Sequence, residues 1–227
     1  MSIIGYLVGR MADAHAFSAA ERPGASFVAG EAAFTPTLAA LASELGPEGR
    51  LAVVVPTESD ASLLAAALAA FSPVASAGLV PAWDTFALER VSPRAESMGA
   101  RLRQLRALRL REEGGSRILV FSARSAAQRI SLAMLEYEPL VLAPGLRVDL
   151  EEAARRLAGM GYRREYQVES IGEFSIRGSI LDVFPADASG PVRADLFGDE
   201  IDRLVEFTLS DQRSGAASDR VEVHPAR

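Results

Sequence analysis

The chain has 227 residues, 49% of them hydrophobic and 24% charged, which is typical of a folded globular protein. It has no cysteine, and all 24 basic residues are arginine, so disulfides, thiolate metal sites and a phosphate-binding lysine are excluded. The formal net charge of −6 argues against sequence-independent nucleic-acid binding.

In the first half of the chain, from about Glu31 to Ser131, short apolar runs alternate with alanine-rich helical stretches. Such alternation predicts a parallel sheet covered on both faces, so we expect residues 1–138 to form an α/β domain. Ser59 or Asp60 is the expected N-cap of the first helix after a strand. The expected strands are Leu51–Val55 and Arg117–Phe121, with Gly78–Pro81 as a short strand or a turn, and the expected helices are Ser59–Phe71, Pro93–Arg111 and Ser125–Leu135.

The segment VAGEAAFTPTL lies where a phosphate-binding loop would open a helix. A working P-loop needs a lysine followed by Ser or Thr, but only Gly30 remains here, with Ala33 and Phe34 at those two positions. From these residues we expect either a simple loop-to-helix entry or the degenerate P-loop of a RecA-like domain, and in both cases a chain that binds no cofactor and is not an enzyme. His15 and His224 lie near opposite ends of the chain, and neither has a second ligand at metal-binding spacing, so no metal site is expected.

The helix expected at Pro93–Arg111 carries apolar residues on one side, at three- and four-residue spacing, and arginines on the rest. A solvated helix face explains this pattern most simply, and contact with a phosphate or a partner stays an alternative. The apolar positions are Met98, Leu102, Leu105 and Leu108.

The second half, residues 139–227, predicts a small α+β domain with an antiparallel sheet. A strand near Leu140 precedes a helix from about Asp149 to Met160, which Gly161 ends. Four strand segments then follow, separated by turn-forming residues. They are REYQVES, GEFSIRGSILDVF (in which Gly178 permits a bulge or a close backbone approach), PVRADLF and IDRLVEFTL.

Period-two alternation in these strands predicts one face that mixes arginine, carboxylate and aromatic side chains. In VRADLF, Arg193, Asp195 and Phe197 share this face. In EFSIRG, Phe174 and Ile176 are expected to point inward, with Glu173, Ser175 and Arg177 outward. Arginine and aromatic residues together are typical of a protein–protein interface, whereas cross-strand ion pairing over a buried phenylalanine is the simpler alternative.

Two stretches also match a known family. GYRREYQVESIGEFSIRGSILDVFP followed by PVRADLFGDEIDRLVEFTLSDQRS resembles the domain that UvrB and the transcription-repair coupling factors share. The upstream segment VPAWDTFALERVSPRAESMGARLRQLRAL resembles a signature of the same family. Together they span most of positions 50–227. The degenerate VAGEAAF loop and the LSDQRS segment favour the coupling-factor branch, and a fragment of a UvrB-type ATP-dependent helicase is the alternative.

The resemblance implies an adaptor that recruits UvrA to stalled RNA polymerase in transcription-coupled nucleotide excision repair. It implies UvrA contacts at Arg164, Arg177 and Asp195, with Arg163 replacing or supplementing Arg164. Strand geometry adds Phe184 and Arg193 as neighbours of those contacts. In one position the family pattern has arginine, and this sequence has Ser175.

The same resemblance places the remaining partners and cofactors outside this chain. A carboxy-terminal domain of the whole protein is expected to mask the UvrA site, and other domains to contact RNA polymerase and DNA. ATP and magnesium belong to the motor of the whole protein.

Because no apolar run approaches the ~20 residues of a membrane span and no signal peptide is evident, we expect a cytoplasmic protein with no membrane partner.

Overall fold

The computed structural model describes residues 31–44, 49–71, 76–85, 92–111 and 115–227. Gly30 and His15 lie outside these residues, so the expected degenerate P-loop stays a prediction. The chain divides into two compact units. Among the described residues, the first unit comprises the segments up to Ala82 and Gln104–Arg129, and the second comprises Trp83–Arg103 and Ile130–Arg227.

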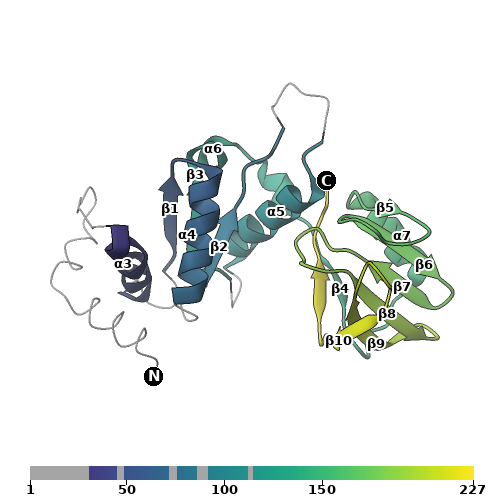
Figure 1. Ribbon diagram of the computed structural model, residues 1–227. Coiled ribbons are helices and arrows are strands. Elements are labelled where there is room, and N and C mark those ends of the chain that lie inside the picture. Colours follow the sequence, from purple (N-terminus) through teal and green to yellow (C-terminus); the bar gives the residue numbers. More distant parts are fainter. Residues whose placement is uncertain (1–30, 45–48, 72–75, 86–91, 112–114) are drawn as a thin grey trace. The chain divides into compact units, whose positions relative to one another are not determined.

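The first unit is an α/β layer built on a parallel sheet, as the sequence predicts (Figure 1). Helix α4 packs against all three strands through Leu64 and Leu68, which meet Ile118 and Val120 in one apolar cluster. In sheet order the strands are β1 (Leu51–Val55), β3 (Ile118–Ser122) and β2 (Ala77–Val80), and the helices are α3 (Glu31–Glu44), α4 (Glu58–Phe71) and α6 (Ala123–Ala127).

Two local expectations for this unit were wrong. The N-cap of α4 is Thr57, whose hydroxyl accepts from the Asp60 N–H at 3.1 Å while the Asp60 carboxylate accepts from the Thr57 N–H at 3.2 Å. The single helix expected at Ser125–Leu135 is interrupted because Gln128 adopts an extended backbone (φ −76°, ψ 121°). It consists of α6 and a 3₁₀ turn at Leu132–Leu135.

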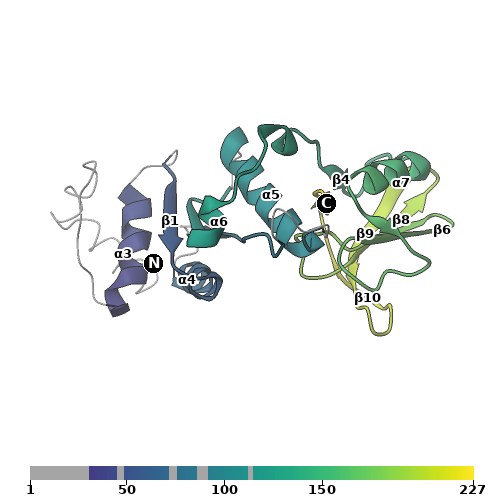
Figure 2. The same cartoon turned by 90° about the horizontal axis from the view of Figure 1, so that it is seen from above.

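The second unit contains a six-stranded sheet, of which β6, β8 and β9 are labelled in Figure 2. The sheet is an antiparallel meander except at one edge, where β5 runs parallel to β6. In sheet order its strands are β10 (Ser214–Ala217), β9 (Glu200–Phe207), β8 (Val192–Phe197), β7 (Ile180–Val183), β6 (Glu173–Arg177) and β5 (Arg163–Arg164). Beside it, β4 (Leu140–Leu142) pairs antiparallel with β11 (Val221–Val223). Helix α5 (Ala95–Leu110) contributes its first turns to this unit.

Helix α7 (Leu150–Gly159) covers one face of the sheet, and its ends follow the sequence closely. The Asp149 carboxylate caps it, accepting from two backbone N–H groups at 2.8 and 3.0 Å, and Gly161 follows it with φ +84°. Leu157 packs against Phe174, Leu181 and Leu204 in the largest apolar cluster of the domain. The inward direction predicted for Phe174 is therefore confirmed.

The opposite face of the sheet is partly covered by the loop 165–172. The expected strand REYQVES is a strand only at Arg164, and Val168 in the following loop packs with Phe184 and Phe207. Glu173 and Ser175, expected to point outward, are 6% and 1% exposed because this loop lies over them. Gly178 (φ +61°) forms a hairpin turn between β6 and β7 rather than a bulge.

No helix in the described part of the chain combines the length and the apolar character needed to cross a membrane.

Candidate partner-binding surface

Beyond the loop 165–172, the second face of the sheet carries a surface that we call the polar face. The strand register aligns Arg177 with Ile180, Ile180 with Asp195, and Asp195 with Arg203, so these side chains form one row across four strands. A second row contains Asp182 and Arg193. The pairing of β8 with β9 shifts between Asp195 and Leu196, but Leu196 packs in the apolar core, so Phe197 lies on the same side of β8 as Asp195. The polar face is defined by Arg177, Ile180, Asp182, Arg193, Asp195, Phe197 and Arg203.

Asp182 lies at the centre of the polar face and joins two of its arginines. Its side chain is 1% exposed, and its carboxylate oxygens accept from Nη2 of Arg177 at 2.7 Å and from Nε and Nη2 of Arg193 at 2.7 and 2.8 Å. A buried carboxylate is stable when such charge-assisted hydrogen bonds satisfy its oxygens. Asp182 therefore fixes the positions of both guanidinium groups.

The two arginines differ in what they leave available to a partner. Arg193 is 13% exposed, lies 4.7 Å above the Phe207 ring and also donates to the Gln212 carbonyl at 3.3 Å. The hydrogen bond with Asp182 raises the pKa of Arg193 above its ordinary value. Arg177 has a side chain that is 35% exposed. Arg193 therefore supports the sheet, whereas Arg177 presents part of its guanidinium to solvent.

Asp195 differs from Asp182 in how its charge acts: without a hydrogen bond to Arg193, it adds to the effect of Asp182 in raising the pKa of that arginine. Asp195 is partly exposed, and within the described residues its carboxylate makes no ion pair. Arg203, its register partner on β9, is exposed and also forms no ion pair within the part of the chain that the structure describes. The polar face therefore presents a carboxylate and two guanidinium groups that can pair with a partner's charges.

The neighbouring residues Arg163 and Arg164 lie on opposite faces of the sheet. Arg163 pairs in register with Glu173, and its Nη2 lies 2.6 Å from the Glu173 carboxylate. The same carboxylate accepts from the Glu169 and Ser170 N–H groups at 2.9 Å each, which holds the loop 165–172 in place. Arg164 is exposed and lies opposite Phe174, on the face that α7 covers. The structure therefore places Arg163, and not Arg164, on the side of the polar face.

Phe184 is only 7% exposed and belongs to the apolar cluster with Val168 and Phe207. In this conformation its ring supports the loop 165–172 and offers little surface to a partner.

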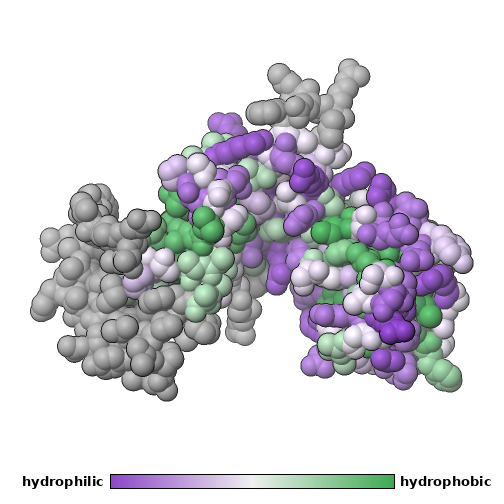
Figure 3. All heavy atoms as spheres, viewed as in Figure 1, coloured by the Kyte–Doolittle hydropathy of each residue, from purple (hydrophilic) through white to green (hydrophobic). Residues whose placement is uncertain are grey.

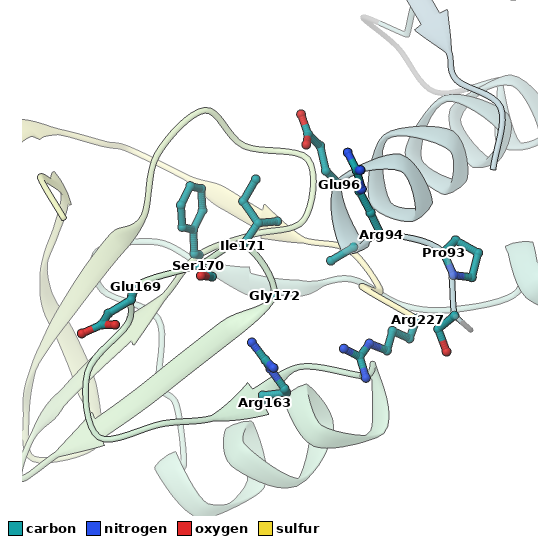
Figure 4. Close-up of a pocket in the computed structure, with 13 residues that line it drawn as sticks. Pro93, Arg94, Glu96, Arg163, Glu169, Ser170, Ile171, Gly172 and Arg227 are labelled. Atoms are coloured by element: carbon teal, nitrogen blue, oxygen red, sulfur yellow. The ribbon is translucent and has the colours of Figure 1, made fainter. Parts of the chain in front are cut away.

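A hollow of about 480 Å³ adjoins Arg163 at the edge of the sheet. Figure 4 shows that Arg163 from β5, Arg94 from the segment before α5, and Glu169 from the loop all line it. Arg94 is held by Asp84 at 3.0 Å, and Arg163 by Glu173, so two of its cations already have carboxylate partners.

Hydrophilic side chains cover much of the visible surface of the second unit, with smaller hydrophobic areas between them (Figure 3). One exposed apolar residue belongs to the polar face: Phe197 is 85% exposed. Strand alternation predicted its face, but it was not among the contacts that the family resemblance supplied. Asp182 was missed, although an acidic residue inside the apolar run SILDVF was a usable signal.

Comparison with known proteins gives two concordant matches. A family model described as the UvrB interaction domain matches residues 140–227. Curated relatives named transcription-repair-coupling factor include those of Mycobacterium bovis and Mycobacterium tuberculosis, each 37% identical over 178 residues, which is 77% of this chain and 14% of the relative. The Escherichia coli relative is 31% identical over 145 residues, 63% of this chain and 12% of its own length. The chain thus spans about a seventh, or less, of these relatives.

Proposed function

We propose that this chain, which belongs to the transcription-repair coupling factor family and carries a UvrB interaction domain, is an adaptor that binds UvrA through the polar face. In the whole protein this contact would bring the excision machinery to a stalled RNA polymerase. ATP hydrolysis, magnesium and the polymerase and DNA contacts would belong to other regions of that protein. The α/β unit would be a degenerate P-loop domain, and residues 139–227 would be the UvrA-binding domain.

The arrangement of Arg177 and Asp195 is the observation that carries this proposal. Both lie in one row of the polar face, and the Asp195 carboxylate has no ion-pair partner within the described residues. Arg177 is held by Asp182, so little side-chain entropy remains to be lost when it binds a carboxylate. A fixed guanidinium and a carboxylate, separated in the row by Ile180, fit a partner surface that carries the opposite charges at the matching positions.

The rest of the polar face contributes in different ways. Arg163 would extend the basic edge toward β5, while Arg193 would act by holding Asp182 in place. Arg164, which the family resemblance implies as a contact, would require the partner to reach the face that α7 covers.

The proposal is tested by titrating purified UvrA with the chain and with two arginine variants. Arg177→Ala should weaken binding by about 30-fold, since removing an interface arginine typically costs ~2 kcal/mol. Arg155→Ala is the matched control, because Arg155 is a 73% exposed arginine on α7, which covers the opposite face of the sheet. Equal affinities for the chain and Arg177→Ala would contradict the proposed surface. No binding by the unaltered chain would overturn the proposed function.

A further inference from the structure

The hairpin between β8 and β9 presents an aromatic side chain at its tip. Phe197 is 85% exposed, and Gly198, with φ +66°, provides the turn that follows it. Strand alternation places Phe197 on the polar face, two residues beyond Asp195, and the Leu196 N–H bonds to the Ser179 carbonyl at 2.9 Å. The backbone next to the ring is therefore hydrogen-bonded to the neighbouring hairpin, at the same end of the sheet as Arg177.

Phe197 contributes little to the fold itself. The apolar cluster under α7 takes its side chains from the opposite face of β8, namely Val192, Ala194 and Leu196. The second cluster, around Phe184 and Phe207, lies at the other end of the polar face. A phenylalanine that packs in neither cluster exposes apolar surface to water without a folding benefit.

Charged residues around Phe197 are mainly acidic. With Phe197 they line a shallow hollow of about 410 Å³, and Asp195 lies beside it on the same strand. Asp199 is 3.7 Å from Arg147, and both of these side chains remain well exposed. The acidic residues that line the hollow are Asp199, Glu200 and Asp202.

We infer that Phe197 is the apolar anchor of the partner contact and inserts into an apolar recess with a basic rim on UvrA. Interfaces combine a desolvated aromatic residue with a surrounding ring of polar contacts, and the polar face supplies both parts. The acidic hairpin complements a rim of Lys or Arg, and Arg177 and Asp195 set the orientation. This inference rests on the proposed function, and it adds the residue and the partner chemistry that would supply most of the affinity.

The inference is tested by measuring the affinity of purified UvrA for Phe197→Ala, Phe197→Leu and Leu63→Ala variants of the chain. Leu63 is the control because it is a 68% exposed apolar residue on α4, in the first unit. Phe197→Ala should weaken binding at least about tenfold and Phe197→Leu less, while Leu63→Ala stays within about twofold. The midpoint of thermal unfolding should not change in any of the three, because the replaced side chains are exposed.

The basic rim is tested separately with a double variant, Glu200→Gln with Asp202→Asn. Association with UvrA should slow at low salt and lose part of its salt dependence.

Phe197→Ala binding within twofold of the unaltered chain, or an equal loss in Leu63→Ala, would overturn the aromatic anchor while leaving the proposed function intact. Unchanged association of the double variant would overturn the basic rim. If the unaltered chain does not bind, the proposed function and this inference fail together.

Discussion

Arg193 donates two hydrogen bonds to the Asp182 carboxylate, from Nε to Oδ1 at 2.7 Å and from Nη2 to Oδ2 at 2.8 Å. This bidentate pair joins β7 to β8 within the polar face, and Oδ2 of Asp182 also accepts from Arg177. The structure therefore assigns two different roles, support of the surface and contact with a partner, to residues that the sequence alone predicts as one arginine-rich face. Asp182 and Arg193 hold the side chains of the polar face in place. Arg177, Asp195 and Phe197 are the side chains that a partner can contact.

Asp182→Ala should destabilise the domain strongly. Removing one partner of a buried ion pair typically costs ~3–5 kcal/mol, because the remaining charges lose their compensation. The free energy of unfolding, measured by urea titration, reports this loss. Asp199→Ala is the matched control, since Asp199 forms an exposed ion pair with Arg147 that should contribute at most about 1 kcal/mol. Equal stability of the two variants would show that Asp182 does not hold the sheet together.

Tyr162 should make the stability of the domain sensitive to alkaline pH. Its hydroxyl donates to the His224 carbonyl at 2.8 Å and accepts from the Ala186 N–H at 2.9 Å, and burial raises its pKa. Because the folded pKa exceeds the unfolded value of about 10, the stabilisation is complete below that pH and decreases as pH rises above it. Urea unfolding between pH 8 and about 11 should show this decline.

Tyr162→Phe should lower the free energy of unfolding by ~1–3 kcal/mol at neutral pH, since the Ala186 N–H loses its acceptor. It should also flatten the decline at alkaline pH. Tyr166→Phe, at an 85% exposed site, should change neither quantity. An alkaline decline that persists unchanged in Tyr162→Phe would assign the titration to another group.

Arg163 and Arg164 form a natural test of which face UvrA contacts. Arg163→Ala should weaken UvrA binding several-fold, because Arg163 lies on the side of the polar face and its partner Glu173 anchors the loop 165–172. Arg164→Ala should change affinity by less than about twofold, as expected outside the contact. Surface plasmon resonance with immobilised UvrA would rank the two variants. The reverse order would indicate that UvrA contacts Arg164, as the family resemblance implies, and therefore reaches the face that α7 covers.

The chain should bind no ATP. Without lysine it lacks the side chain that contacts the β- and γ-phosphates in a working P-loop. Isothermal titration with ATP and magnesium should give only the heat of dilution, whereas an intact P-loop ATPase measured in parallel gives a binding isotherm. A saturable signal from this chain would favour the alternative of a UvrB-type helicase fragment.

The sequence predicted the elements whose signals are local. Asp149 as a cap and Gly161 as a terminator delimit α7, and strand alternation placed Arg193, Asp195 and Phe197 on one face. Both are properties of a few neighbouring residues, so tertiary contacts did not override them.

The remaining features depend on contacts between distant segments. The loop 165–172 buries Glu173 and Ser175, although alternation predicts them to be exposed. The parallel pairing of β5 with β6 decides that Arg163 and not Arg164 shares the side of the polar face. Neither the coverage of a sheet face nor the register of an edge strand is encoded in the strand's own pattern.

Asp195→Arg tests the central claim most directly. Its carboxylate makes no ion pair within the described residues, so reversing its charge removes no internal salt bridge, although it places a cation opposite Arg203 and near Arg193. Titration of UvrA with this variant should show a loss of affinity of about 30-fold or more, and the midpoint of thermal unfolding, measured in parallel, should stay above the temperature of the titration. An affinity equal to that of the unaltered chain would mean that UvrA does not contact the polar face.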